Sequence, residues 1–171
     1  MTGTKDQGFT LIEMLLVVAV ISINAAIAVP GLLHSQTNAN ETSAIMSLKL
    51  TTSAQVAYSA SCGNGGYAAS FVVLGTPPPG GHGFVPADLG SVAAPQKSGY
   101  NFTLGAGAGA MAGPTDCNGT GTITTYFATG VPMDGTTGTR SFAVNQRNTI
   151  WQLAGGVAPK EPFGAPAVPV Q

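Results

Sequence analysis

One apolar run dominates the first part of the chain. Residues 14–33 are all apolar apart from Ser22 and Asn24. A run of about 20 apolar residues is long enough for an α-helix to cross the hydrocarbon core of a membrane. Glu13 lies inside the apolar segment, near its start, where an unpaired carboxylate costs roughly 2.5–3.5 kcal/mol. We therefore treat Glu13 as a candidate functional residue.

The helical pattern continues beyond the apolar run in an amphipathic form. Small and apolar residues recur at intervals of three and four, which predicts a helix with one face covered by a domain. From Asn40 onward no helix breaker precedes Cys-Gly-Asn-Gly-Gly at 62–66, which is a strong stop signal. The pattern predicts one helix from near Phe9 to near Ala60. The face expected to be covered consists of Ala44, Ile45, Leu48, Thr52 and Val56.

Three polar or helix-breaking positions interrupt the apolar segment. Pro30 removes a backbone donor and clashes with the preceding turn, so the sequence predicts a bend or a melted turn there. Ser22 and Asn24 are expected to bond either their own backbone or a neighbouring helix, or simply to be tolerated.

The remainder of the chain has the pattern of a small sheet. The 62–98 segment contains Thr-Pro-Pro-Pro-Gly-Gly at 76–81 and is expected to be a connecting loop, with one turn or a short strand at 71–74. Alternating, β-branched and aromatic residues then predict strands, and the short helix-free connections predict an antiparallel meander packed on the helix. Prolines mark 155–171 as an irregular tail. The predicted strands are 98–104, 121–129, 140–145 and a short fourth at 149–153.

Composition narrows the function classes. Charged residues make up 8% of the chain and the net charge is −1, so no basic surface for nucleic acid is expected. Neither a Gly-x-Ser-x-Gly nor a Gly-x-Gly-x-x-Gly motif is present, and the two histidines have no cysteine or carboxylate cluster beside them. We expect no enzymatic activity, no cofactor and no metal site.

Two cysteines, Cys62 and Cys117, lie beyond the apolar segment. An even pair in an exported domain favours one disulfide, and the alternative is two buried thiols. If formed, the bridge would tie the sheet to the end of the helix.

The start of the chain carries a more specific signal. Gly8-Phe9-Thr10-Leu11-Ile12-Glu13 follows a short polar leader with Lys5 and precedes the apolar run. This arrangement resembles the class III signal of type IV prepilins and pseudopilins. The resemblance implies a pilin fold of the α+β class, with a long N-terminal helix, half transmembrane and half amphipathic, against an antiparallel sheet of three to four strands. The alternative is an uncleaved signal anchor.

The resemblance also implies how the chain is processed. A membrane prepilin peptidase would cut between Gly8 and Phe9 and methylate Phe9. Glu13 matches the acidic position of the family, and Phe9 and Glu13 are four apart, on one helix face. The new amine of one subunit could then pair with Glu13 of its neighbour. Pro30 matches the proline that commonly breaks the pilin helix.

The implied function is that of a structural subunit of a type IV pilus. Its partners would be identical subunits, the peptidase, and an assembly platform with its ATPase. The chain would reside in the inner membrane as a prepilin and then in an extracellular fibre. The alternatives are a type II secretion pseudopilin, or a minor pilin with an adhesive or DNA-uptake role. The expected segments are a leader (1–8), an assembly helix (9–33), an amphipathic helix half (34–61), a loop (62–98), a sheet (99–154) and a tail (155–171).

Overall fold

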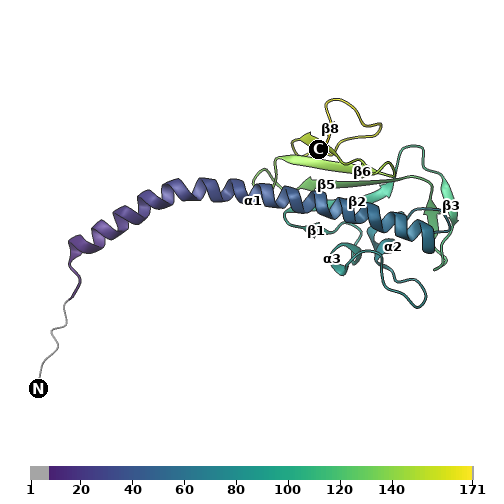
Figure 1. Ribbon diagram of the computed structural model, residues 1–171, viewed down its shortest axis with the longest axis horizontal. Coiled ribbons are helices and arrows are strands. Elements are labelled where there is room, and N and C mark those ends of the chain that lie inside the picture. Colours follow the sequence, from purple (N-terminus) through teal and green to yellow (C-terminus); the bar gives the residue numbers. More distant parts are fainter. Residues whose placement is uncertain (1–7, 171) are drawn as a thin grey trace, which may run out of the picture. The chain divides into compact units, whose positions relative to one another are not determined.

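The computed structural model describes residues 8–170 and begins with one long helix (Figure 1). Helix α1 spans Leu11–Ser61, 51 residues. The chain divides into two compact units, Met1–Gln36 and Thr37–Gln171, and α1 contributes to both. After the helix, Asn64 and Gly65 adopt positive φ angles of 51° and 90°. The single long helix and its stop signal are thus confirmed, with a start two residues later than predicted.

Helix α1 is continuous through Pro30. The prediction of a melted turn at Pro30 is therefore wrong. Pro30 removes one backbone donor, and the helix continues through it and through Gly31 despite the turn preference of a Pro-Gly pair.

The second unit is built on a six-stranded antiparallel sheet with the order β1-β2-β5-β6-β7-β8. A separate antiparallel pair, β3-β4, lies between β2 and β5 in sequence. Two short helices, α2 (Phe71–Gly75) and α3 (Ala87–Gly90), precede the sheet. The strands are β1 (Gln96–Lys97), β2 (Tyr100–Ala106), β3 (Ala112–Thr115), β4 (Gly121–Ile123), β5 (Tyr126–Pro132), β6 (Arg140–Asn145), β7 (Trp151–Ala154) and β8 (Val168–Pro169).

The sheet agrees with the predicted α+β class but is larger than three to four strands. The predicted strand 140–145 is β6, whereas the predicted strand 121–129 is two strands in different sheets. The division falls at 124–125, because Ile123 pairs with Tyr67 while Tyr126 begins the pairing with β2. The run of β-branched residues at 121–129 does not indicate that the chain changes from one sheet to the other there.

Two segments expected to be irregular contain regular structure. The connection 62–98 contains α2 and α3, which bury Phe71, Leu74 and Leu89. The tail contributes β8, which pairs with β7, and the Val170 N–H donates to the Ile150 carbonyl at 2.8 Å. Buried apolar side chains hold the connection, whereas the tail is held by its pairing with β7.

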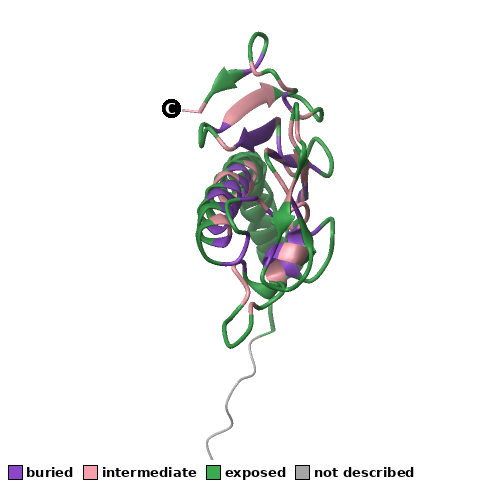
Figure 2. Cartoon of the chain, turned by 90° about the vertical axis from the view of Figure 1, so that its right-hand side faces the viewer, coloured by how far each residue is buried: buried purple, intermediate pink, exposed green. Residues whose placement is uncertain are grey.

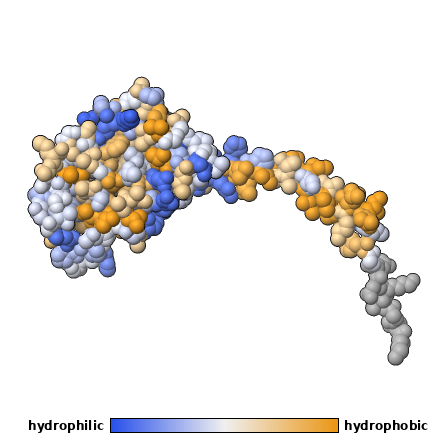
Figure 3. Space-filling view, turned by 180° about the vertical axis from the view of Figure 1, so that it is seen from behind, coloured by the Kyte–Doolittle hydropathy of each residue, from blue (hydrophilic) through white to orange (hydrophobic). Residues whose placement is uncertain are grey.

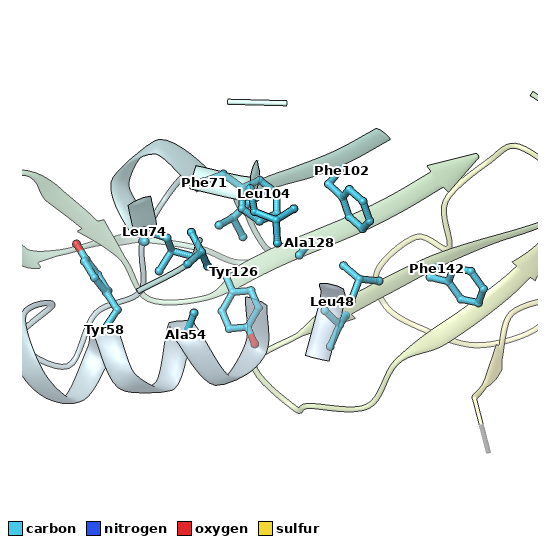
Figure 4. Close-up of a cluster of buried hydrophobic side chains, with 14 of the residues drawn as sticks. Leu48, Ala54, Tyr58, Phe71, Leu74, Phe102, Leu104, Tyr126, Ala128 and Phe142 are labelled. Carbon is cyan, nitrogen blue, oxygen red and sulfur yellow. The ribbon is translucent and has the colours of Figure 1, made fainter. Parts of the chain in front are cut away.

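The core lies between the second half of α1 and one face of the sheet (Figure 2). In Figure 4, Leu48 of α1 lies nearest Phe102 and Phe142 of the sheet, Ala54 lies beside Tyr126, and Tyr58 lies on the side of Leu74. Val56, predicted to be covered, is 51% exposed. The buried side of α1 instead follows a spacing of three and four through Glu41, Ala44, Leu48, Thr51, Gln55 and Tyr58.

The predicted disulfide is present between Cys62, just beyond α1, and Cys117. The Cys117 N–H also donates to the Cys62 carbonyl at 2.8 Å. The end of α1 is therefore joined both covalently and by a backbone hydrogen bond to the loop that precedes β4.

Reduction of this disulfide should lower the free energy of unfolding by about 4 kcal/mol, because the bridge closes a loop between residues 55 apart. Denaturant titration of the detergent-solubilised chain, with and without reductant, measures the effect. A Cys62→Ser/Cys117→Ser variant is the control and should not respond to reductant. Equal stability of the oxidised and reduced chains would contradict the prediction.

Candidate processing and assembly site

The candidate cleavage site lies immediately before α1. Gly8, Phe9 and Thr10 are not helical, and α1 begins at Leu11. Phe9 is 76% exposed, and within residues 8–170 no heavy atom beyond the adjacent residues lies within 4 Å of the position that a Cβ would take at Gly8. The described part of the chain therefore leaves the Gly8–Phe9 peptide bond accessible.

Thr10 and Glu13 form a capping box at the start of α1. The Thr10 N–H and Oγ1 donate to Glu13 Oε2 at 2.9 and 2.6 Å, and the Glu13 N–H donates to Thr10 Oγ1 at 3.3 Å. This reciprocal arrangement satisfies backbone donors that a helix start leaves unpaired. Glu13 thus has a partner within its own chain.

The position of Phe9 differs from the prediction. The sequence spacing placed Phe9 and Glu13 on one helix face, but Phe9 lies two residues before α1, where helical spacing does not apply. Thr10 is the residue that bonds Glu13 in the uncleaved chain. Sequence analysis missed this role of Thr10, although Thr-x-x-Glu before an apolar run is a recognisable capping signature.

All residues of the first half of α1, 11–36, are exposed, and apolar side chains cover much of the face of this segment seen in Figure 3. An 18-residue window of this helix has a mean hydropathy of 2.4, and none of it is buried within the structure. Ser22 Oγ and Asn24 Nδ2 donate to the carbonyls of Val18 and Val20 at 2.7 and 2.9 Å. The first alternative for these two side chains, bonding to their own backbone, is confirmed, so the helix presents a nearly continuous apolar surface.

In the second unit, Glu41 connects α1 to the start of β6. Its side chain is buried, and it accepts hydrogen bonds from the Thr139 N–H and Oγ1 at 2.9 and 2.8 Å. Arg140 donates to it from Nε at 2.7 Å and also from Nη2. Burial raises the pKa of Glu41, but the hydrogen bonds and the charge of Arg140 outweigh it, so the pKa lies below the usual 4.5.

Two further polar residues of α1 have specific partners across the core. Gln55 donates to the Ala68 carbonyl and accepts from the Ala68 N–H, both at 2.9 Å. The Tyr58 hydroxyl donates to Asp116 Oδ2 at 2.7 Å. Burial and the Asp116 carboxylate raise the pKa of Tyr58. These bonds fix the position of the helix end relative to the loops around the disulfide.

Glu41, Gln55 and Tyr58 were not predicted as contact residues. The predicted covered face followed mainly apolar positions, and two of these three side chains are strongly polar. The spacing 41, 44, 48, 51, 55, 58 is itself a regular pattern of threes and fours. Reading that spacing without regard to polarity would have found the buried face. Among residues 8–170, no group of three or more His, Cys, Asp or Glu side chains is placed to hold a metal ion.

Comparison with known proteins places the similarity at the N-terminus. Residues 3–29 match the prokaryotic N-terminal methylation motif. The chain is 41% identical over 54 residues to the type IV major pilin protein PilA of Myxococcus xanthus, covering 32% of this chain and 24% of that protein. It is 53% identical over 36 residues to the type IV wide pilus major component PilA4 of Thermus thermophilus, covering 21% and 28%.

The similar stretches therefore span about a quarter of the length of each relative. No solved structure matches the chain at comparable significance. The N-terminal segment carries a type IV prepilin motif and is similar to type IV major pilins, while the sheet and the tail lie outside the matched motif.

The Glu41–Arg140 contact should make stability depend on pH. Because the folded-state pKa of Glu41 is lowered, its contribution is present above the unfolded-state value and is lost as the pH falls through the folded-state value. A Glu41→Gln variant should be less stable at pH 7 by about 1–3 kcal/mol, and the gap to the unmodified chain should narrow below pH 4.5. Denaturant titration across this range gives the measurement.

Asp88→Asn is the matched control, because Asp88 pairs with Lys97 in an exposed contact at 2.8 Å. Such a pair contributes roughly 0–1 kcal/mol. A Glu41→Gln gap that stays constant well below pH 4.5 would contradict the assignment.

Proposed function

We propose that this chain is a structural subunit of a type IV pilus, cleaved between Gly8 and Phe9, N-methylated at Phe9 and polymerised through the first half of α1. The observation that carries the proposal is the combination at the start of α1. An accessible Gly8–Phe9 bond, a single carboxylate in the first helical turn and a fully exposed apolar helix follow one another without interruption.

The uncleaved chain fits a membrane-anchored precursor. The apolar half of α1 is long enough to span the bilayer. Glu13 would then enter the membrane boundary with its oxygens already accepting from Thr10, which lowers the cost of its charge. Because the Gly8–Phe9 bond precedes the helix, its amide and carbonyl are not held in the helical ladder. A membrane peptidase with methyltransferase activity is the partner at this stage.

Cleavage changes the electrostatics of the helix start. It creates a positive amine at Phe9, four residues from Glu13 in sequence. In a bundle of helices, that amine can pair with Glu13 of the neighbouring subunit, so that two buried charges compensate each other. Pairing of one charge per helix also fixes the axial register of subunits, as a lone buried polar group does in coiled coils. The helices of neighbouring subunits then replace the lipid around the apolar half of α1.

The second unit fits the role of a domain carried along the fibre. Its disulfide and its three polar contacts to α1 hold it on the second half of the helix, which leaves the first half available for packing. The partners are identical subunits and an assembly platform whose ATPase supplies the energy for extraction from the inner membrane. Both relatives are major components of their pili, which favours a pilus subunit over a secretion pseudopilin.

Replacement of Glu13 by Val should separate processing from assembly. The variant removes the proposed partner of the Phe9 amine but keeps the apolar helix, so export and cleavage should continue while surface fibres are lost. Immunoblots of membrane fractions report cleavage, and electron microscopy of sheared material reports fibres.

Ser22→Ala is the matched control for this experiment. It also removes a polar group from the apolar half of α1, but the Ser22 hydroxyl bonds only its own helix at Val18. This control should assemble normally. Normal fibres from Glu13→Val would refute the proposed pairing.

A further inference from the structure

The methionines of the second unit all lie at its surface. Methionine is one of the residue types most often fully buried, and its flexible thioether commonly fills gaps in a core. The buried core of this unit consists instead of aromatic residues, Leu, Val, Ile, Ala and Cys, with no methionine among residues 37–170. Met46, Met111 and Met133 are 64%, 70% and 50% exposed.

At each of these sites the backbone is held by hydrogen bonds that do not involve the thioether. Met46 lies in the interior of α1. The Met111 N–H donates to Thr124 Oγ1 at 2.9 Å, and the Met111 carbonyl accepts from the Thr124 N–H at 3.0 Å. The Met133 N–H donates to the Gly99 carbonyl at 2.9 Å. The three side chains can therefore change chemically while the backbone keeps its partners.

Helix α1 separates sulfur from the core within a few residues. Ala44 and Leu48 are fully buried in the core, whereas Met46 and Leu50 are exposed. Residues four apart share a helix face, so Met46 and Leu50 belong to the side of α1 that the sheet leaves uncovered. The covered side of the helix contains leucine but no thioether.

Exposure decides what oxidation of a thioether does to a protein. A hydroperoxide transfers one oxygen atom to the sulfur, which gives up two electrons. The O–O bond breaks, an S=O bond forms, and the proton of the transferred oxygen passes to the departing oxygen, which leaves as an alcohol or as water. The sulfoxide is polar, so it disrupts a core, and it can be reduced enzymatically. On the surface the new polar group remains in water.

We propose that Met46, Met111 and Met133 are oxidation sites that take oxygen atoms from hydroperoxides and leave the folded second unit intact. Oxidation at these positions places no polar group in the core, because the core of the described residues contains no thioether. Cys62 and Cys117 are already joined in a disulfide, so the three thioethers hold the reduced sulfur of this unit. The sites lie within the second unit and do not depend on polymerisation.

The full chain, solubilised in a zwitterionic detergent, is treated with hydrogen peroxide and sampled over time. Mass spectrometry of its peptides measures oxygen uptake at each methionine, and denaturant titration of the same samples measures stability. We expect each of the three sites to gain one oxygen atom at close to the rate of a free methionine derivative, with an unchanged denaturant midpoint. The triple variant Met46→Leu/Met111→Leu/Met133→Leu is the blank, and its midpoint reports on damage at any other group.

Two single variants of α1 form a matched pair, because both exchange leucine for methionine at nearly constant volume. The thioether added by Leu50→Met, on the exposed side, should react as fast as Met46 and leave the midpoint unchanged. The one added by Leu48→Met, on the buried side, should react at least about tenfold more slowly, because it is reached only when the fold opens. Its oxidation should lower the midpoint. The proposal is overturned if any of the three natural sites reacts as slowly as the one added by Leu48→Met, or if oxygen uptake at these sites lowers the midpoint relative to the blank.

Discussion

The apolar half of α1 is the constraint on which the rest of the structure depends. Its side chains are exposed on every side, and none of the apolar window is buried by the chain itself. At about 25 cal/mol for each Å² of apolar surface, leaving such a helix in water is strongly unfavourable. The helix therefore needs a bilayer or other helices around it. The capping box at Thr10 and Glu13 begins the helix where this apolar surface begins.

The second half of the same helix meets the opposite condition, because the sheet of its own chain covers it. Here the contact is specified by polar groups as well as by apolar packing. Glu41, Gln55 and Tyr58 each bond a different part of the second unit. Apolar packing alone tolerates sliding of a helix along a sheet, whereas directional hydrogen bonds permit one position. The same helix therefore has an apolar first half that is available to partners and a second half that is fixed in one position against the sheet.

The sequence predicted best the elements that depend on residues close to one another along the chain. The long helix, its stop at 62–66 and the strand at 140–145 follow from spacing and turn residues. The disulfide joins residues 55 apart and was predictable only because the chain has two cysteines. The division of 121–129 between two sheets, the pairing of β8 and the polar contacts of α1 depend on partners distant in sequence. At the candidate site, Gly8, Phe9 and Glu13 were found from their motif. The cap from Thr10 had a local signature, whereas the partners of Glu41 and Tyr58 are set by the fold of the second unit.

We propose that the Gly8–Phe9 bond is cut and that the remaining chain becomes a fibre subunit through α1. Mass spectrometry of fibres sheared from the cell surface tests it most directly. We expect an abundant peptide that begins with N-methylated Phe9, together with the rest of the chain and its intact Cys62–Cys117 bridge. Recovery of only an uncleaved form beginning at Met1, confined to the membrane fraction, would contradict the claim.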